Sequence, residues 1–578
     1  KWYLSLYFVN NMLRISTSTL GLKRVTAAST INGLRDNLNL ILSPNNQKVR
    51  FQSTEPSPEP EKSKGGIFNK IFGIDSNVAS ESFKSRWAMA VPAFATHMAI
   101  GSTWGWSIMA DVVTREKGFV TSAASDWTLM ESAFPISIVF LVLGLSASVA
   151  GKWQIKVGAR HAIAVSALTF GGGLVAGAAG IHMHSLPLLY VGYGCMAGTG
   201  LGLAYTPPVQ TLMQWFPDKK GIASGLPIAG FGSGALVFAP AVQYLMKHFA
   251  TMPEYLGPLG QYTTTFQNGK LLADVNGTMV EVVQAGAAEL AKIPYTLSEG
   301  LYVVGTGATG AAEALAVMGG VYFAMLMGSA LTLKKPHASF IAPKSVVKEG
   351  GFVAPVPARE ISLDEAMRTK QFYLLGTAFY CLATGGIGVF SVAKPMMSEV
   401  FSTALPAVVT SAFAAKYILM LSAGNLGGRL GWAALSDAIG RRKTLTIFTA
   451  GSIPLYLFLP TLVDSVVSTG SSLPLYGFCV NTALAISMMG GVYAILPAYE
   501  ADLFGTRFSG AVHGRMLLFS SAAALSGPTM LLSLRAMAEK AAVTDLLTKV
   551  SPEKFQAVFG APIESAMELL QSKALTIG

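Results

Sequence analysis

Two residues in one apolar segment carry the clearest chemistry of this sequence. Arg429 lies in the segment 405–432, where Lys416 is the only other charged residue, and Asn425 precedes it by four positions. On a helix the two side chains would therefore lie one turn apart on the same face. A cation at depth in an apolar helix is costly unless it is paired, and a guanidinium offers a planar fork that fits a carboxylate. We predict that Arg429 binds a carboxylate and that Asn425 orients the arginine or the ligand; the alternatives are an interfacial arginine and a helix-packing amide.

A charged stretch follows that segment directly. Asp437 precedes the basic run Arg441-Arg442-Lys443 by four residues. Short loops rich in lysine and arginine stay on the inner side of a membrane. The run therefore predicts which end of the preceding helix faces inward.

Two further titratable residues lie within or at the end of apolar segments. His97, in 87–111, can carry a proton near neutral pH, with a hydrogen-bonded core histidine as the alternative. Lys394 ends the segment 371–394, and we consider it as a ligand or gate residue against an interfacial lysine. The sequence has no metal-ligand spacing, phosphate-binding loop or nucleophile motif, so we expect no metal, no cofactor and no enzyme activity.

The composition places the chain in a membrane. Only 13% of its 578 residues are charged, about half of what soluble domains carry, and the mean hydropathy is +0.48. The net charge of +11 could indicate nucleic-acid binding, but the basic residues stand in short loops between apolar runs, which is the pattern of a multi-pass membrane protein. The three cysteines lie far apart in apolar runs and are read as packing residues.

Eleven apolar segments are long enough to cross a bilayer as tilted helices. The loops that join even to odd segments are basic and so predict the inner side, together with the amino terminus. The segments are 87–111, 128–150, 161–182, 186–212, 221–246, 312–333, 371–394, 405–432, 444–463, 474–498 and 510–534.

The remaining regions have distinct compositions. Residues 1–66 combine an Arg- and Ser-rich, acid-poor stretch that is typical of a transit peptide with a Pro-rich disordered linker; a basic cytoplasmic tail is the alternative. Residues 247–311 form an outer insertion with amphipathic stretches such as 272–292, and 334–370 form a central inner loop. The tail after 534 is amphipathic, and we expect a twelfth helix to be missing from a truncated chain.

An internal repeat divides the chain into two halves. The stretch 151–161, after the second segment, matches Asp437–Lys443, after the eighth, at an offset of 282 residues. Similar loops on the same side, six segments apart, indicate a parallel repeat of two six-helix halves. We therefore expect a first half at 87–333 and a second half at 371–578 with five helices and the tail.

These features resemble the major facilitator superfamily (MFS). Ser436-Asp-Ala-Ile-Gly-Arg-Arg-Lys443 resembles its signature loop, and within it the chain resembles the oxalate:formate antiporter family, related to monocarboxylate porters. The residues that carry this are 198–205, 215–221, 230–234 and Asn425-Leu-Gly-Gly-Arg429. The resemblance implies an all-α polytopic fold, and it implies that Asp437, Arg441 and Arg442 act at a gate.

The resemblance also implies a binding site, with two departures. The family's oxalate transporters hold two carboxylates with an arginine, matched by Arg429, and a lysine in the eleventh helix, where this chain has Phe519-Ser-Ser521. His513 and Arg515 are the nearest replacements for that lysine. Ile155 stands where the first-half loop normally has an aspartate. Aromatic residues on the first, fourth and tenth helices line the family's site, which points to the set Trp104, Trp106, Tyr205 and Tyr493.

We therefore expect a secondary carrier of small carboxylates that works by alternating access, as an antiporter or a proton symporter. A monocarboxylate fits a single arginine better than a dicarboxylate does. The alternatives are a carrier of a non-anionic solute and a non-transporting sensor or assembly subunit. We expect a monomer in a lipid bilayer, in the mitochondrial inner membrane, or alternatively in the plasma membrane or that of another organelle, with a small organic anion as substrate.

Overall fold

The computed structural model describes residues 78–80, 85–114, 127–267, 270–275, 277–286, 297–341, 359–402, 404–548 and 552–553. The predicted transit segment and linker lie outside these residues, as do most of the central loop and the side chain of Lys394. The chain divides into two compact units, Ile71–Ser533 and the two terminal segments together, Lys1–Lys70 with Leu534–Gly578.

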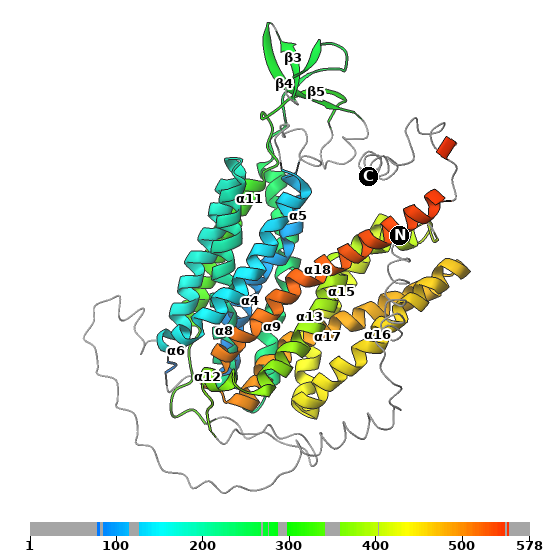
Figure 1. Cartoon of the computed structure of the whole chain (residues 1–578). Coiled ribbons are helices and arrows are strands. Elements are labelled where there is room, and N and C mark those ends of the chain that lie inside the picture. Colours follow the sequence, from blue (N-terminus) through cyan, green and yellow to red (C-terminus); the bar gives the residue numbers. More distant parts are fainter. Residues whose placement is uncertain are drawn as a thin grey trace, which may run out of the picture. The chain divides into compact units, whose positions relative to one another are not determined.

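Long apolar helices make up the first half of the chain (Figure 1). The first predicted span is interrupted, since a 3₁₀ turn of Ser102–Gly105 separates two short helices. The elements are η2 (Arg86–Met89), α4 (Ala90–Gly101), η3 (Ser102–Gly105), α5 (Trp106–Val112), α6 (Leu129–His182), α7 (Leu186–Leu189), the π-helical η4 (Tyr190–Ala197), α8 (Gly198–Trp215), α9 (Lys220–Phe249) and α11 (Ala311–Thr332).

The second half repeats this pattern of long helices. Thr369 and Thr410 begin two of them, because each hydroxyl accepts a hydrogen bond from the backbone N–H three residues later. The predicted seventh span is shorter than expected, ending at Ser391. The elements are α12 (Leu363–Ala366), α13 (Lys370–Ser391), α14 (Ala393–Phe401), α15 (Ser411–Ile439), α16 (Arg441–Thr469), α17 (Ser472–Phe504) and α18 (Ser509–Thr548).

Among the described residues, eight helices are long and apolar enough to cross a membrane. One of them, α6, has 54 residues, about twice the length that one crossing needs. It holds two predicted spans, and the ten-residue loop expected between them is instead a single non-helical residue, Gly158. The mostly helical fold is confirmed, while this loop prediction was wrong because Gly151–Val157 continue the helix.

The repeat is visible in the backbone at two equivalent glycines. Gly158 turns the chain within α6 with φ 81° and ψ 170°, and Gly440, 282 positions later, turns it between α15 and α16 with φ 97° and ψ 148°. Residues with a side chain rarely adopt positive φ, so glycine is the residue that allows this tight reversal. The match at this offset agrees with the repeat predicted from the sequence.

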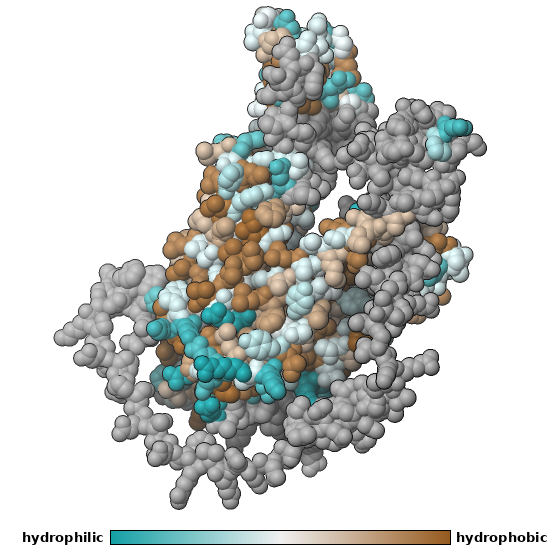
Figure 2. Space-filling model, viewed as in Figure 1, coloured by the Kyte–Doolittle hydropathy of each residue, from teal (hydrophilic) through white to brown (hydrophobic). Residues whose placement is uncertain are grey.

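The basic loops meet at one end of the helices. Lys152 Nζ lies 2.9 Å from Asp364 Oδ2, and the Trp215 indole N–H donates to the carbonyl of Lys334 at 2.8 Å. The Lys152 ammonium lowers the pKa of the Asp364 carboxyl below its usual range. Figure 2 shows hydrophilic residues gathered at this lower end, around α12 and the middle of α6, with hydrophobic surface above them. We call it the basic end.

At the opposite end, the insertion 247–311 forms a β-sheet, which corrects the all-α expectation (Figure 1). The five antiparallel strands, in the order β1-β5-β4-β3-β2, are β1 (Tyr255–Gly257), β2 (Thr264–Gln267), β3 (Lys270–Val275), β4 (Thr278–Ala285) and β5 (Gly300–Val303). Residues 272–292 were expected to be an amphipathic stretch of this insertion, and their described part contains most of β3 and all of β4.

The sequence carries a signal for this sheet that the helical reading overlooked. Asn276-Gly277 stands between the paired residues Val275 and Thr278, and Asn-Gly is a strong signal for a two-residue hairpin turn. Gly277 has φ 82°, and its N–H donates to Asp274 Oδ1 at 2.8 Å. The β-branched and alternating residues of β4 then favour the strand over the helix.

Candidate substrate site

The side chain of Arg429 is buried between the two halves of the chain. Helix α15 carries it toward α9, where its Nη1 donates to the carbonyl of Ile228 at 2.9 Å. Its Nε donates to Asn425 Oδ1 at 2.7 Å, and only 2% of the residue is exposed. A guanidinium has five N–H donors. Among the described residues, Arg429 finds two acceptors for them, the Ile228 carbonyl and Asn425 Oδ1. Most of its donors therefore remain for a ligand.

Aromatic rings face the guanidinium from both halves. Its carbon lies 5.6 Å from the ring centre of Phe231 on α9 and 5.4 Å from that of Tyr493 on α17. The face of an aromatic ring attracts a cation, which offsets part of the cost of burial. Gly232 adds room, because a Cβ there would lie 3.1 Å from Arg429 Nε. The Tyr493 hydroxyl is hydrogen-bonded to Ser520 Oγ at 2.6 Å, which holds the ring in place.

The first half contributes a second layer of rings beside Phe231. Tyr205 on α8 lies 5.5 Å from Phe231 and 5.2 Å from the His97 ring on α4, measured between ring centres. Tyr205 and His97 are buried, and the Tyr205 hydroxyl and His97 Nε2 have no hydrogen-bond partner in the described structure. Trp104 also reaches Phe231, at 6.4 Å. A buried polar atom without a hydrogen-bond partner can bond to a ligand or a water molecule, and here two such atoms lie in the layer next to the ring that faces Arg429.

Trp106, a residue of the predicted site, does not join this cluster. Trp106 donates from Nε1 to the Ser132 carbonyl at 2.8 Å and packs on Tyr193 at 4.1 Å, within the first half. The backbone of Lys394 lies in α14, just after the break at Val392 that ends α13, and its side chain is outside the described residues. We leave both out of the site proposed below.

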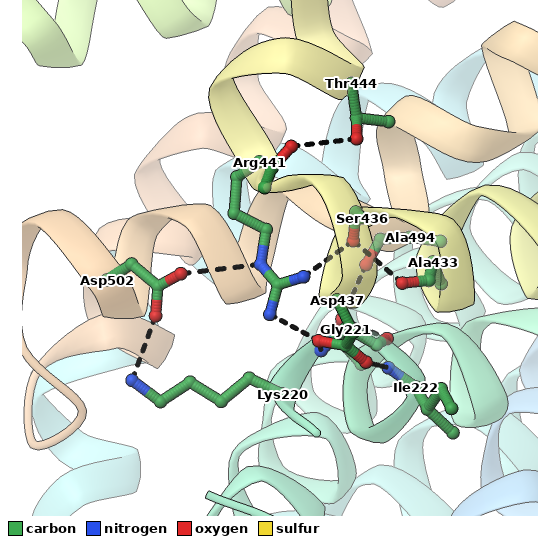
Figure 3. A network of polar contacts seen from close by, with 12 residues as sticks. Lys220, Gly221, Ile222, Ala433, Ser436, Asp437, Arg441, Thr444, Ala494 and Asp502 are labelled. Atoms are coloured by element: carbon green, nitrogen blue, oxygen red, sulfur yellow. Dashed lines mark hydrogen bonds and ion pairs between the residues drawn. The ribbon is translucent and has the colours of Figure 1, made fainter. Parts of the chain in front are cut away.

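A charged cluster joins the two halves at the basic end (Figure 3). Asp437 accepts hydrogen bonds from the backbone N–H groups of Gly221 and Ile222, each at 2.9 Å, at the start of α9. A carboxylate at a helix N-terminus is stabilised by the unpaired N–H groups and by the helix dipole. Asp437 also accepts from Arg441 Nη2 at 2.5 Å. We call this cluster the charged junction.

A second carboxylate completes the charged junction. Asp502 on α17 lies 3.0 Å from Lys220 Nζ and 3.4 Å from Arg441 Nε, measured from its two oxygens. Arg441 also donates to Ser436 Oγ at 2.8 Å. Two acids thus face two bases in a largely buried place. Arg442, which the sequence grouped with Arg441, is exposed instead.

Sequence reasoning missed several residues that the fold brings to these places. Phe231 was passed over within the glycine-rich stretch 230–234, and Asp502 and Glu500 near the end of α17 were not singled out. Acidic residues directly after an apolar segment, still within reach of the same helix, are a signal that could have marked the last two. Their partners lie far away in sequence, so the pairing itself could not be read from it.

No family model matches the sequence. Among solved structures, the fucose:proton symporter FucP of E. coli is 13% identical, with 78% of this chain and 93% of that chain covered and a TM-score of 0.49. Shorter sequence matches include monocarboxylate transporter 11 of Mus musculus, 28% identical over 163 residues, which covers 28% of this chain and 34% of that protein.

Three curated relatives match most of the chain. The MFS-type transporter YhjX of Escherichia coli is 24% identical, with 73% of this chain and 81% of that protein covered. The oxalate:formate antiporter of Oxalobacter formigenes is 26% identical, covering 77% and 83%, and apicoplast pyruvate carrier 1 of Toxoplasma gondii is 26% identical, covering 68% of each. Over most of its length the chain is thus similar, at 24–26% identity, to an MFS-type transporter, an oxalate:formate antiporter and a pyruvate carrier, and its described part has the long apolar helices of a multi-pass membrane protein.

Proposed function

We propose that the chain is a secondary carrier of small monocarboxylates that works by alternating access. The observation that carries this proposal is Arg429, a buried cation with open donors between the rings of Phe231 and Tyr493. A carboxylate can accept two parallel hydrogen bonds from a guanidinium, and its charge offsets the cost of holding that cation in an apolar bundle. Asn425 holds the fork in orientation through the bond to Nε.

The residues of α18 near this arginine favour one carboxylate over two. Ser520 is bonded to Tyr493, and Ser521 Oγ donates to the carbonyl of Phe140 at 2.6 Å. Phe519 packs on Phe372, with ring centres 6.2 Å apart. These positions supply no second cation for a dicarboxylate. A monocarboxylate, with a flat apolar part that fits between aromatic faces, matches the described groups better.

The names of the relatives support a carboxylate substrate. One is described as an oxalate:formate antiporter, one as a pyruvate carrier and one as a monocarboxylate transporter. Their shared chemistry is a small organic anion. In our proposal the rings of Tyr205 and Trp104 close around this anion, while Asp437 and Arg441 hold the basic end shut in one state of the cycle.

The test is counterflow of labelled formate, pyruvate, lactate and oxalate in proteoliposomes. Arg429→Gln should lower exchange of the preferred monocarboxylate at least 100-fold, because the charge and the fork are both lost. Arg429→Lys should lower it about tenfold or more, because an ammonium keeps the charge without the planar fork. Lys416→Gln is the matched control, since it removes an exposed cation from the same helix, and it should leave exchange unchanged.

Two outcomes would contradict the proposal. Transport of a neutral or cationic solute that survives Arg429→Gln would show a different substrate class. Absence of flux for every anion tested, with folded wild-type protein in the vesicles, would favour a sensor or assembly role.

We also propose the mitochondrial inner membrane as the location. The support is the basic, acid-poor composition of residues 12–50, which contain six basic residues and the single acid Asp36. A fluorescent protein fused after residues 12–60 should enter mitochondria. Retention of the fusion in the cytosol, or delivery to another organelle, would overturn this location and leave the carrier proposal standing.

A further inference from the structure

A buried acid–imidazole pair lies beside the aromatic layer of the site. Glu500 on α17 is fully buried, and His513 on α18 is 2% exposed. His513 Nδ1 lies 3.1 Å from both carboxylate oxygens of Glu500. The other ring nitrogen, Nε2, is buried without a hydrogen-bond partner among the described residues. A carboxylate and an imidazole so placed can share a proton, and burying them inside a membrane helix pair is costly unless they serve a purpose.

Ring contacts connect this pair to the substrate site. The His513 ring stacks on Tyr205 at 5.9 Å, with 26° between the ring planes. Tyr205 in turn packs on Phe231, the ring that faces the Arg429 guanidinium. The pair is therefore two rings away from the arginine, near enough in a low-dielectric interior for charges to affect one another.

The positive and negative charges around the pair can be counted group by group. In the charged junction, Asp437 and Asp502 offset Lys220 and Arg441. Asn425, the side chain bonded to Arg429 on its own helix, is an amide and carries no charge.

Around the aromatic layer this leaves one positive guanidinium, Arg429, and one carboxylate, Glu500, because the charge of Arg515 acts on Asp364 at the basic end. The groups that face the pair or its ring contacts are His97 on α4, Tyr205 on α8, Arg429 on α15 and Tyr493 on α17. Asp502 and Arg515 each follow two residues later on the same helices as Glu500 and His513. With both histidines neutral, the empty site has no net charge.

We propose that Glu500 and His513 form a proton-binding site that loads one proton for each monocarboxylate bound at Arg429. The anion would leave the site with a net charge of −1. A proton taken from water forms one N–H or O–H bond on the pair and restores neutrality. Both the empty and the loaded carrier can then change between the states open to the two sides of the membrane without moving net charge across the bilayer. This inference rests on the proposed function and names its coupling ion.

The experiment measures protons and substrate together in proteoliposomes that contain a trapped pH dye. With equal pH on both sides, an inward gradient of labelled pyruvate should acidify the interior by one proton per pyruvate, after subtraction of protein-free vesicles. Glu500→Gln should lower uptake driven by an acidic exterior at least tenfold, while pyruvate exchange at equal pH falls less than threefold. His513→Gln should give the same split.

The control is Glu313→Gln, which changes a half-buried glutamate of α11 whose neighbour is His182 at 4.0 Å. It should leave both measurements unchanged. Wild-type pyruvate uptake without acidification would overturn the proton site while the carrier proposal stands, and this result needs no variant to fold. If the wild type exchanges none of formate, pyruvate, lactate and oxalate, the proposed function itself fails.

Discussion

The two halves make the same turn after equivalent helices but attach to the facing half by different forces. In the second half, Asp437 bonds to the first N–H groups of α9, and Arg441 and Asp502 surround it. In the first half, the position equivalent to Asp437 is Ile155, a half-buried apolar residue that offers no acceptor to the start of α18.

Close packing replaces charge on that side. A Cβ at Gly151 of α6 would lie 2.7 Å from the Cα of Ala511, and a Cβ at Gly514 of α18 would lie 2.4 Å from the carbonyl oxygen of Ala147. The helices approach through small residues, as is common for helices packed in membranes. We call this contact between α6 and α18 the packed junction.

The comparison shows two kinds of contact between the halves at one end of the bundle, one made by charges and one by close packing. If the charged junction opens in the proposed cycle, its charges regain water, so much of the lost attraction is returned as hydration. When the packed junction opens, close contacts are lost and no charge is rehydrated. The charged junction should therefore respond to substitution of charge, and the packed junction to substitution of volume.

Of the two junctions, the charged one should show the larger effect. Asp437→Asn leaves Lys220 and Arg441 with Asp502 as their remaining acid, and an uncompensated buried charge costs about 3 kcal/mol. We expect a lower unfolding temperature of the purified protein and at least a tenfold loss of transport. Asp464→Asn, at an exposed position of α16, is the matched control and should change neither. Wild-type behaviour of Asp437→Asn would mean that the junction contributes little.

A smaller effect is expected from volume at the packed junction. Gly514→Val forces atoms into the contact with Ala147, and overpacking of this kind costs about 1–3 kcal/mol. Thermal unfolding and pyruvate counterflow should both decline. Gly320→Val, on α11, meets no atom within 4 Å of the new Cβ and serves as the control. If both valine variants lose equal stability, close packing between α6 and α18 is not the cause.

The smallest effect should come from making the two junctions alike. Ile155→Asp places a carboxylate where the second half has Asp437, and an acid near a helix N-terminus contributes about 0.3–1 kcal/mol. We expect up to a fivefold slower transport rate, because the basic end is held shut more firmly. Ile155→Asn, which lacks the charge, should stay closer to the wild type. A faster rate for the aspartate variant would contradict the comparison.

Some of the candidate site was predictable from local spacing alone. Asn425 and Arg429 are four residues apart on one helix, so their contact follows from helix geometry. Trp106 shows the limit of such reasoning, since it shares a segment with Trp104 yet packs on Tyr193 rather than near the arginine. Trp104 lies within the 3₁₀ turn Ser102–Gly105 and Trp106 begins the next helix, so the spacing of an ordinary α-helix does not predict where the two rings point.

The sequence by itself determined the membrane class, the helical segments, the repeat and the place of the buried cation. These follow from hydrophobicity, charge in short loops and the fixed geometry of a helix, all of which act over a few residues. Tertiary structure alone decided which groups far apart in the sequence meet. Asp437 bonds to residues more than 200 positions away, and Glu500 meets His513 only because α17 and α18 lie together. Such contacts depend on how whole helices pack, which local pattern does not encode.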